Sequence, residues 1–144
     1  NEIARSHVII LQFAGSGERW VPAIDSLLSN LTPNQHFILL SDFPSLDKNP
    51  LRVNRGILKD NTKSITYNVS LSLPCDSIKG LIKSKPRAYY LDLSKSRVFD
   101  SVPFFRDTLM YYDKGHLNTY GTKVYAQETE AQFMNVLDSV FVRL

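Results

Sequence analysis

Residues 7–13 read HVIILQF and residues 36–40 read HFILL, two uninterrupted apolar runs rich in branched side chains. Such runs are typical of strands that are buried on both faces, as in the parallel sheets of α/β proteins. Between them, apolar residues recur at helical spacing over residues 19–31, and the polar turn 32–34 ends that segment. Strand, helix and strand in this order predict a βαβ unit.

The remaining sequence extends this pattern. It predicts a helix within residues 71–84, a third buried strand at residues 88–93, and a final helix that starts after an Asn118 or Thr119 cap. The residues expected on the core side of that last helix are Val124, Ala131, Met134, Leu137 and Phe141. The sequence therefore predicts a three-layer α/β/α sandwich with a mainly parallel sheet.

Length and composition narrow the class of protein. The chain has 144 residues, a hydrophobic fraction of 43% and a net charge of +3, which suit one soluble domain. Its basic residues are scattered, so no nucleic-acid partner is indicated. It has no apolar stretch of roughly 18 residues and no signal-peptide pattern. The one cysteine, Cys75, is expected to be a buried or half-buried thiol.

The stretch LMYYDKGHLNTYGTKV, residues 109–124, carries the residues best suited to chemistry. Asp113 and His116 are three residues apart at a helix entrance, so the carboxylate can reach a ring nitrogen of the histidine. A carboxylate in this position fixes the tautomer of the imidazole and leaves the other nitrogen for a nucleophile. Gly115 is expected to supply the backbone angle of the turn. The pair therefore predicts a general base with its orienting carboxylate.

The phrase YYDKGHLNTYG resembles the last block of SGNH (GDSL-like) hydrolases. It is similar, more narrowly, to the extracytoplasmic SGNH domains that follow membrane acyltransferases of the acyltransferase-three type. In that block the aspartate and histidine belong to a Ser-His-Asp triad. Asp113, His116, Leu117 and Gly121 match the pattern, and Asn118 replaces its usual serine.

The resemblance implies O-acetyl transfer to a bacterial surface glycan. It implies a carbohydrate acceptor, an upstream membrane acyltransferase domain as partner, and a place on the periplasmic face of the inner membrane. No metal or cofactor is expected to bind this domain, and acetyl-coenzyme A would be the remote acyl donor. Two alternatives remain open: a glycan esterase that removes acetyl groups, and a non-catalytic carbohydrate-binding or scaffold domain.

The nucleophile of the family lies in a Gly-Asp-Ser block at the end of the first strand, and no Gly-Asp-Ser occurs in this sequence. The expectation is that residues 1–144 form one SGNH-like domain, truncated at its N-terminus, whose first strand and nucleophile lie before Asn1. Ser16, between Gly15 and Gly17, is the alternative nucleophile, because it follows a strand and precedes a helix. Backbone amides at Gly15, Ser16 and Gly17 are candidates for binding a developing oxyanion.

Two further residues are candidate substrate contacts. Trp20, the one tryptophan, suits stacking on a sugar ring, although a core position is the more usual one for such a residue. Arg19 suits contact with an anionic or sugar substrate, and the alternative is a solvated helix start. His7 and His36 each begin a predicted strand and are expected at the surface or at an edge.

Overall fold

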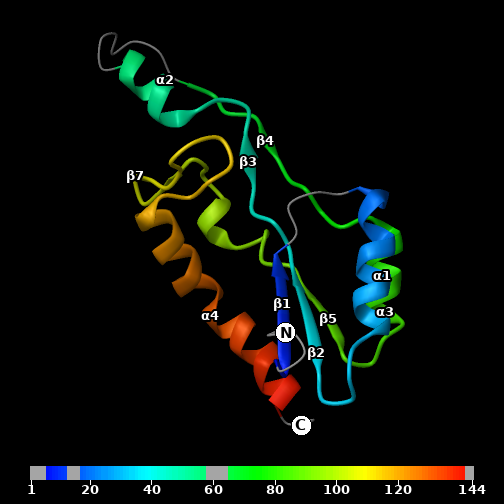
Figure 1. Cartoon of the computed structure of the whole chain (residues 1–144). Coiled ribbons are helices and arrows are strands. Elements are labelled where there is room, and N and C mark those ends of the chain that lie inside the picture. Colours follow the sequence, from blue (N-terminus) through cyan, green and yellow to red (C-terminus); the bar gives the residue numbers. More distant parts are fainter. Residues whose placement is uncertain (1–5, 13–16, 58–64, 142–144) are drawn as a thin grey trace. The chain divides into compact units, whose positions relative to one another are not determined.

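The structure, a computed structural model, describes residues 6–12, 17–57 and 65–141. The chain divides into two compact units (Figure 1). The first comprises residues 1–42, 72–93 and 131–144, and the second comprises residues 43–71 and 94–130.

The first unit is built on a parallel sheet in the order β1-β2-β5. These strands are β1 (Val8–Gln12), β2 (His36–Leu40) and β5 (Ala88–Leu91). Ile38 pairs with Ile10 on one side and with Tyr89 on the other, so β2 is the central strand. The run HFILL was predicted as a strand over the same residues, and its centre is fully buried, as expected for a strand with neighbours on both edges.

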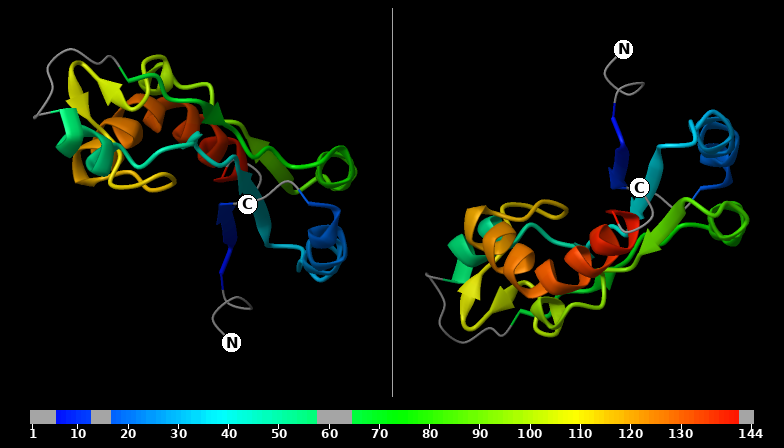
Figure 2. Two further views of the ribbon diagram at one scale, coloured as in Figure 1. Left: turned by 90° about the horizontal axis from the view of Figure 1, so that it is seen from above. Right: turned by 90° about the horizontal axis from the view of Figure 1, so that it is seen from below.

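Helices lie on both faces of this sheet (Figures 1 and 2). One face carries α1 (Val21–Ser29), preceded by the 3-10 helix η2 (Glu18–Trp20), and α3 (Asp76–Lys83). The other face carries the C-terminal half of α4 (Thr119–Phe141). The core between the sheet and the first two helices consists of Ile24, Leu28, Phe37, Leu39, Ile78 and Ile82. The predicted three-layer α/β/α arrangement with a parallel sheet is confirmed.

Strand β1 differs from the expectation of a strand buried on both faces. Ile10 is 47% exposed and Leu11 is 37% exposed. The cause is its position in the sheet, because β1 is an edge strand and β2 is its one partner among the described strands. His36 differs in the opposite sense: it was expected at the surface, yet it is buried in the central strand, where its ring stacks on Tyr89.

The second unit consists of short elements around its own core. It contains β3 (Ser45–Leu46) paired with β4 (Val69–Ser70), α2 (Pro50–Ile57), the 3-10 helix η3 (Arg97–Phe99), and the hairpin of β6 (Phe104–Phe105) and β7 (Thr108–Leu109). The N-terminal half of α4 also belongs to it. Its buried core residues are Leu46, Val98, Phe99, Met110, Tyr111 and Val124.

Helix α4 buries different sides in its two halves. Val124 is buried in the second unit and Val140 in the first, although the two positions lie about 160° apart around an ideal helix. The prediction of one continuous core side is therefore wrong for Ala131, Met134 and Phe141, which are exposed. The prediction assumed one stripe of buried residues along the whole helix, whereas the buried side changes along its length. Among the described residues, no helix is long and apolar enough to cross a bilayer.

Candidate active site

The candidate site lies in the turn that connects β7 to α4, within the second unit. Tyr111 and Leu117 form an isolated antiparallel bridge across this turn. The amide of Tyr112 donates to the carbonyl of His116 at 2.8 Å, and the amide of Asn118 donates to the carbonyl of Met110 at 2.7 Å. Below the turn, Tyr111 is fully buried and its hydroxyl donates to the carbonyl of Pro44 at 2.6 Å. The turn is therefore tied to the core at its base.

Asn118 fixes the point where the turn becomes helix. Its side-chain Oδ1 accepts a hydrogen bond from the amide of Gly121 at 2.8 Å, three residues into the helix, as an N-cap residue does. Its Nδ2 donates to the carbonyl of Leu109 at 2.7 Å. The sequence left Asn118 and Thr119 open as the cap; the structure assigns the cap to Asn118 and makes Thr119 the first helical residue.

Asp113 and His116 meet inside this turn. The Nδ1 atom of the His116 ring lies 2.9 Å from both carboxylate oxygens of Asp113. The Oδ1 atom of Asp113 also accepts hydrogen bonds from the amides of Gly115, at 2.8 Å, and His116, at 2.9 Å. A carboxylate can only accept, so this contact places the proton of a neutral imidazole on Nδ1 and leaves the Nε2 lone pair outward.

These hydrogen bonds also determine the charge of Asp113. The Gly115 amide and the His116 ring lower the pKa of the Asp113 carboxyl below its ordinary value. Donors that bind a carboxylate stabilise its ionised form, so Asp113 is an anion near neutral pH. An ionised carboxylate against Nδ1 is the arrangement that stabilises a protonated imidazole when the base has taken a proton.

Replacing Asp113 with asparagine is expected to destabilise the chain in a pH-dependent way. Because the folded-state pKa is lowered, the stabilisation is present above the unfolded-state pKa of about 3.9 and is lost as the pH falls through the folded-state pKa. The side chain is 34% exposed, so solvent screening limits the loss at pH 7 to no more than about 1 kcal/mol.

Urea unfolding of the wild type and Asp113→Asn at pH 7 and below pH 3 measures this difference. Asp138→Asn, an exposed position of α4, is the matched control and should show little difference at either pH. An effect of Asp113→Asn that stays the same at both pH values would contradict the assignment.

The His116 ring is accessible for chemistry. Its side chain is 78% exposed, and no hydrogen bond within the described residues uses its Nε2 atom. The neighbouring Tyr112 is 63% exposed. Gly115 does not play the expected part, because it lacks a left-handed backbone angle and a Cβ there would meet nothing within 4 Å. Its contribution is its amide, which any residue except proline would supply.

The other predicted site residues are not part of this turn. Gly15 and Ser16 lie outside the described residues, so their predicted roles stay predictions. Gly17, Arg19 and Trp20 lie in the first unit, whereas Asp113 and His116 lie in the second. Trp20 is 41% exposed, which contradicts the core position, and the Arg19 guanidinium lies 5.4 Å from the centre of its ring. Within the described residues there is no cluster of three or more histidine, cysteine or carboxylate ligands for a metal.

One feature of the second unit was not predicted from the sequence: a pocket lined in part by Arg97 and Arg106. It lies in residues 94–107, for which no element was predicted. The two-residue hairpin loop there reads Arg-Asp, without the glycine or asparagine that usually marks such loops. The strands on either side of the loop have two residues each, which is too short for an alternation of apolar and polar residues to predict the hairpin.

A solved structure shares this fold. It is the periplasmic domain of a lipopolysaccharide acetyltransferase from Salmonella ser. Paratyphi A, and the two structures superpose with a TM-score of 0.57 at 18% sequence identity. The similarity covers 92% of this chain but 59% of the Salmonella domain, so this chain spans little more than half of that domain's length. No family model matches the sequence, and neither does any curated protein.

Proposed function

We propose that this chain belongs to an enzyme that transfers an acetyl group to a bacterial surface glycan in the periplasm. The observation that carries the proposal is the contact of His116 Nδ1 with both oxygens of Asp113, at the entrance of the last helix. Three features support it: this contact, the resemblance of residues 111–121 to the last block of SGNH enzymes, and the fold shared with the Salmonella acetyltransferase domain.

In the proposed reaction, His116 Nε2 removes the proton of a serine hydroxyl while the serine Oγ attacks the acetyl carbonyl. The bond from the carbonyl carbon to the donor breaks, and the donor leaves with the proton from the imidazole. The acetyl-serine is then attacked by a sugar hydroxyl, whose proton passes to Nε2, and the serine regains that proton as the acetyl group leaves. Asp113 holds the ring and stabilises its positive charge in both steps.

We assign the nucleophile to a serine outside residues 1–144, in the upstream block that the resemblance implies. No Gly-Asp-Ser occurs in the sequence. Among the described residues, no serine hydroxyl forms a hydrogen bond with His116. We likewise propose that a membrane acyltransferase portion, as the resemblance implies, delivers the acetyl group.

A fluorophosphonate probe tests this assignment, because it labels serines that a neighbouring histidine activates. In the full-length protein we expect one labelled serine, outside residues 1–144, and no label in the His116→Ala variant. The labelled peptide is identified by mass spectrometry. A label on Ser16 would transfer the role of nucleophile to that residue, and the absence of any label would remove the covalent mechanism.

The acetyl content of the surface polysaccharide distinguishes acetyl transfer from acetyl removal. Cells that produce the full-length protein are expected to gain O-acetyl groups on their surface glycan, seen by proton NMR of the purified polymer. A loss of O-acetyl groups in the same comparison would identify the esterase alternative.

A further inference from the structure

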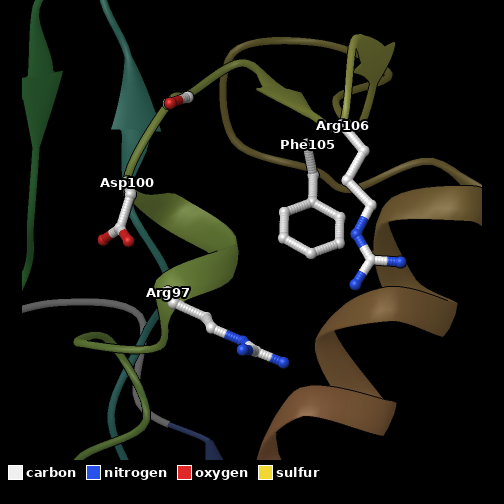
Figure 3. A pocket seen from close by; sticks show the side chains of 5 residues that line it. Arg97, Asp100, Phe105 and Arg106 are labelled. Atoms are coloured by element: carbon white, nitrogen blue, oxygen red, sulfur yellow. The ribbon is translucent and has the colours of Figure 1, made fainter.

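A pocket of about 320 Å³ opens in the second unit between η3 and the β6–β7 hairpin (Figure 3). Its lining consists of Arg97, Asp100, Ser101, Phe105 and Arg106. A volume of this size lies at the lower end of the range that small-molecule sites occupy. The pocket contains neither Asp113 nor His116, so it is distinct from the candidate active site.

The backbone at Arg106 is unusual for an arginine. Arg106 and Asp107 form the two-residue loop of the hairpin, and both have positive φ, 48° and 61°. Glycine and asparagine adopt this conformation readily, and arginine adopts it at a cost in free energy. The loop end of the hairpin is held by the Tyr120 hydroxyl, which donates to the carbonyl of Phe105, the residue before the loop, at 3.1 Å. An arginine kept in a strained position indicates a use for its side chain.

That side chain is held in place by a stacking contact. Its charge acts on Glu128, whose pKa is lowered first by the hydrogen bond from Arg97 and also by the charges of Arg97 and Arg106. The Arg106 guanidinium lies 5.1 Å from the centre of the Phe105 ring, a stacked arrangement that leaves its N–H groups free to donate. Among the described residues, no carboxylate forms an ion pair with Arg106. The Asp100 carboxylate points away from both guanidinium groups (Figure 3).

Arg97 supplies a second guanidinium from the opposite wall. Its Nε lies 2.5 Å from a carboxylate oxygen of Glu128 on α4, and this bond fixes the side chain. No hydrogen bond within the described residues uses its two terminal nitrogens. Figure 3 shows both arginines extending into the space beside the Phe105 ring. Two forked donors match the oxygens of a carboxylate or a phosphate, and among the described residues Arg97 but not Arg106 has a carboxylate within ion-pair distance.

We propose that this pocket binds the anionic group of an acidic sugar, a uronate carboxylate or a sugar phosphate. Arg106 and Arg97 bind the anion, the Ser101 hydroxyl is a neutral partner, and the Phe105 ring contacts the apolar side of the sugar. The pocket thereby becomes a subsite for a charged unit of the acceptor polymer. The assignment of the bound sugar to the acceptor polymer rests on the proposed function, whereas anion binding does not.

Ligand-observed NMR titration of the purified full-length protein tests this site. The probes are methyl glucuronide, glucose 6-phosphate and neutral methyl glucoside. We expect one or both anionic probes to bind, with affinities at least roughly tenfold higher than that of methyl glucoside, because hydrogen bonds to charged groups are the stronger ones. Tighter binding of the glucuronide assigns a carboxylate, and tighter binding of glucose 6-phosphate assigns a phosphate. Equal affinity for the charged and neutral probes would overturn the proposal.

The variant Arg106→Gly separates binding from folding. Glycine relieves the backbone strain, so the midpoint of thermal unfolding is expected to stay the same or rise, while the affinity for the anionic probe falls roughly 10- to 100-fold. Lys123→Gln removes one charge from an exposed position of α4 in the same unit and should keep wild-type affinity. Wild-type affinity in Arg106→Gly, or an equal loss in Lys123→Gln, would overturn the proposal.

The titration measures binding and not acetyl transfer. If acetylation proves independent of His116 while Arg106→Gly loses the anion, the proposed function fails and the subsite remains. If no anion binds while His116→Ala abolishes acetylation, the subsite fails and the catalytic pair remains.

Discussion

Replacing His116 with alanine in the full-length protein is expected to lower acetylation of the surface glycan by about 10²- to 10⁴-fold. General acid–base catalysis by a positioned side chain contributes rate factors of this order. His116 is the base of this turn, since its Nδ1 is held by Asp113 and its Nε2 faces outward. The measurement is the O-acetyl content of the purified polysaccharide, by proton NMR.

The fold is expected to survive this substitution. The His116 side chain is 78% exposed, so its removal should change the free energy of unfolding by no more than about 0.5 kcal/mol. Lys114→Ala, at an exposed position of the same turn, is the matched control and should acetylate normally. Acetylation at the wild-type level in His116→Ala would remove the catalytic assignment.

The largest effect on stability is expected for Gly121→Ala. A Cβ at residue 121 would lie 2.3 Å from the carbonyl oxygen of Met110 and 2.9 Å from the Met110 Cβ. Neither atom can easily withdraw, because that carbonyl accepts the Asn118 amide at 2.7 Å and the Met110 side chain is fully buried. Forcing a methyl group into such a contact is expected to cost about 3 kcal/mol. The start of α4 would then be displaced from the strand that leads into the turn.

Gly80→Ala is the matched control for this experiment. Gly80 also lies in a helix, α3, but a Cβ there meets nothing within 4 Å. Alanine in that position should raise the free energy of unfolding by about 0.5–1 kcal/mol, because it restricts the unfolded chain and favours helix. Urea unfolding of the two variants should therefore shift the midpoint in opposite directions. If both variants unfold at the wild-type midpoint, the close approach of α4 to Met110 is not present in solution.

Local signals in the sequence were sufficient for much of the fold. The strand at residues 36–40 was predicted with the correct first and last residues. A short apolar run bounded by turn residues is enough to identify a buried central strand. The start of α4 and the meeting of Asp113 with His116 were predicted for the same reason. A cap, a turn and a separation of three residues are all contained in one short segment.

The features that were missed depend on distant parts of the chain. The exposure of Ile10 and Leu11 follows from the place of β1 in the sheet, which its own sequence does not contain. The change of buried side along α4 reflects what each half packs against. Arg97 and Arg106 come together only through a hairpin whose loop carries neither glycine nor asparagine, and sequence periodicity has no means of detecting it.

The Oδ1 atom of Asp113 accepts three hydrogen bonds, two from amides of its own turn and one from the imidazole. The same Oδ1 atom therefore stabilises the turn and orients the His116 ring. The carboxylate cannot rotate away from His116 without losing the hydrogen bonds from two main-chain amides. We therefore expect the longer side chain of glutamate at residue 113 to be unable to keep all three hydrogen bonds. The contacts that orient the base thus lie within four consecutive residues, and the turn that contains them is held to the rest of the unit through the Leu46 amide, which donates to the Lys114 carbonyl at 2.7 Å.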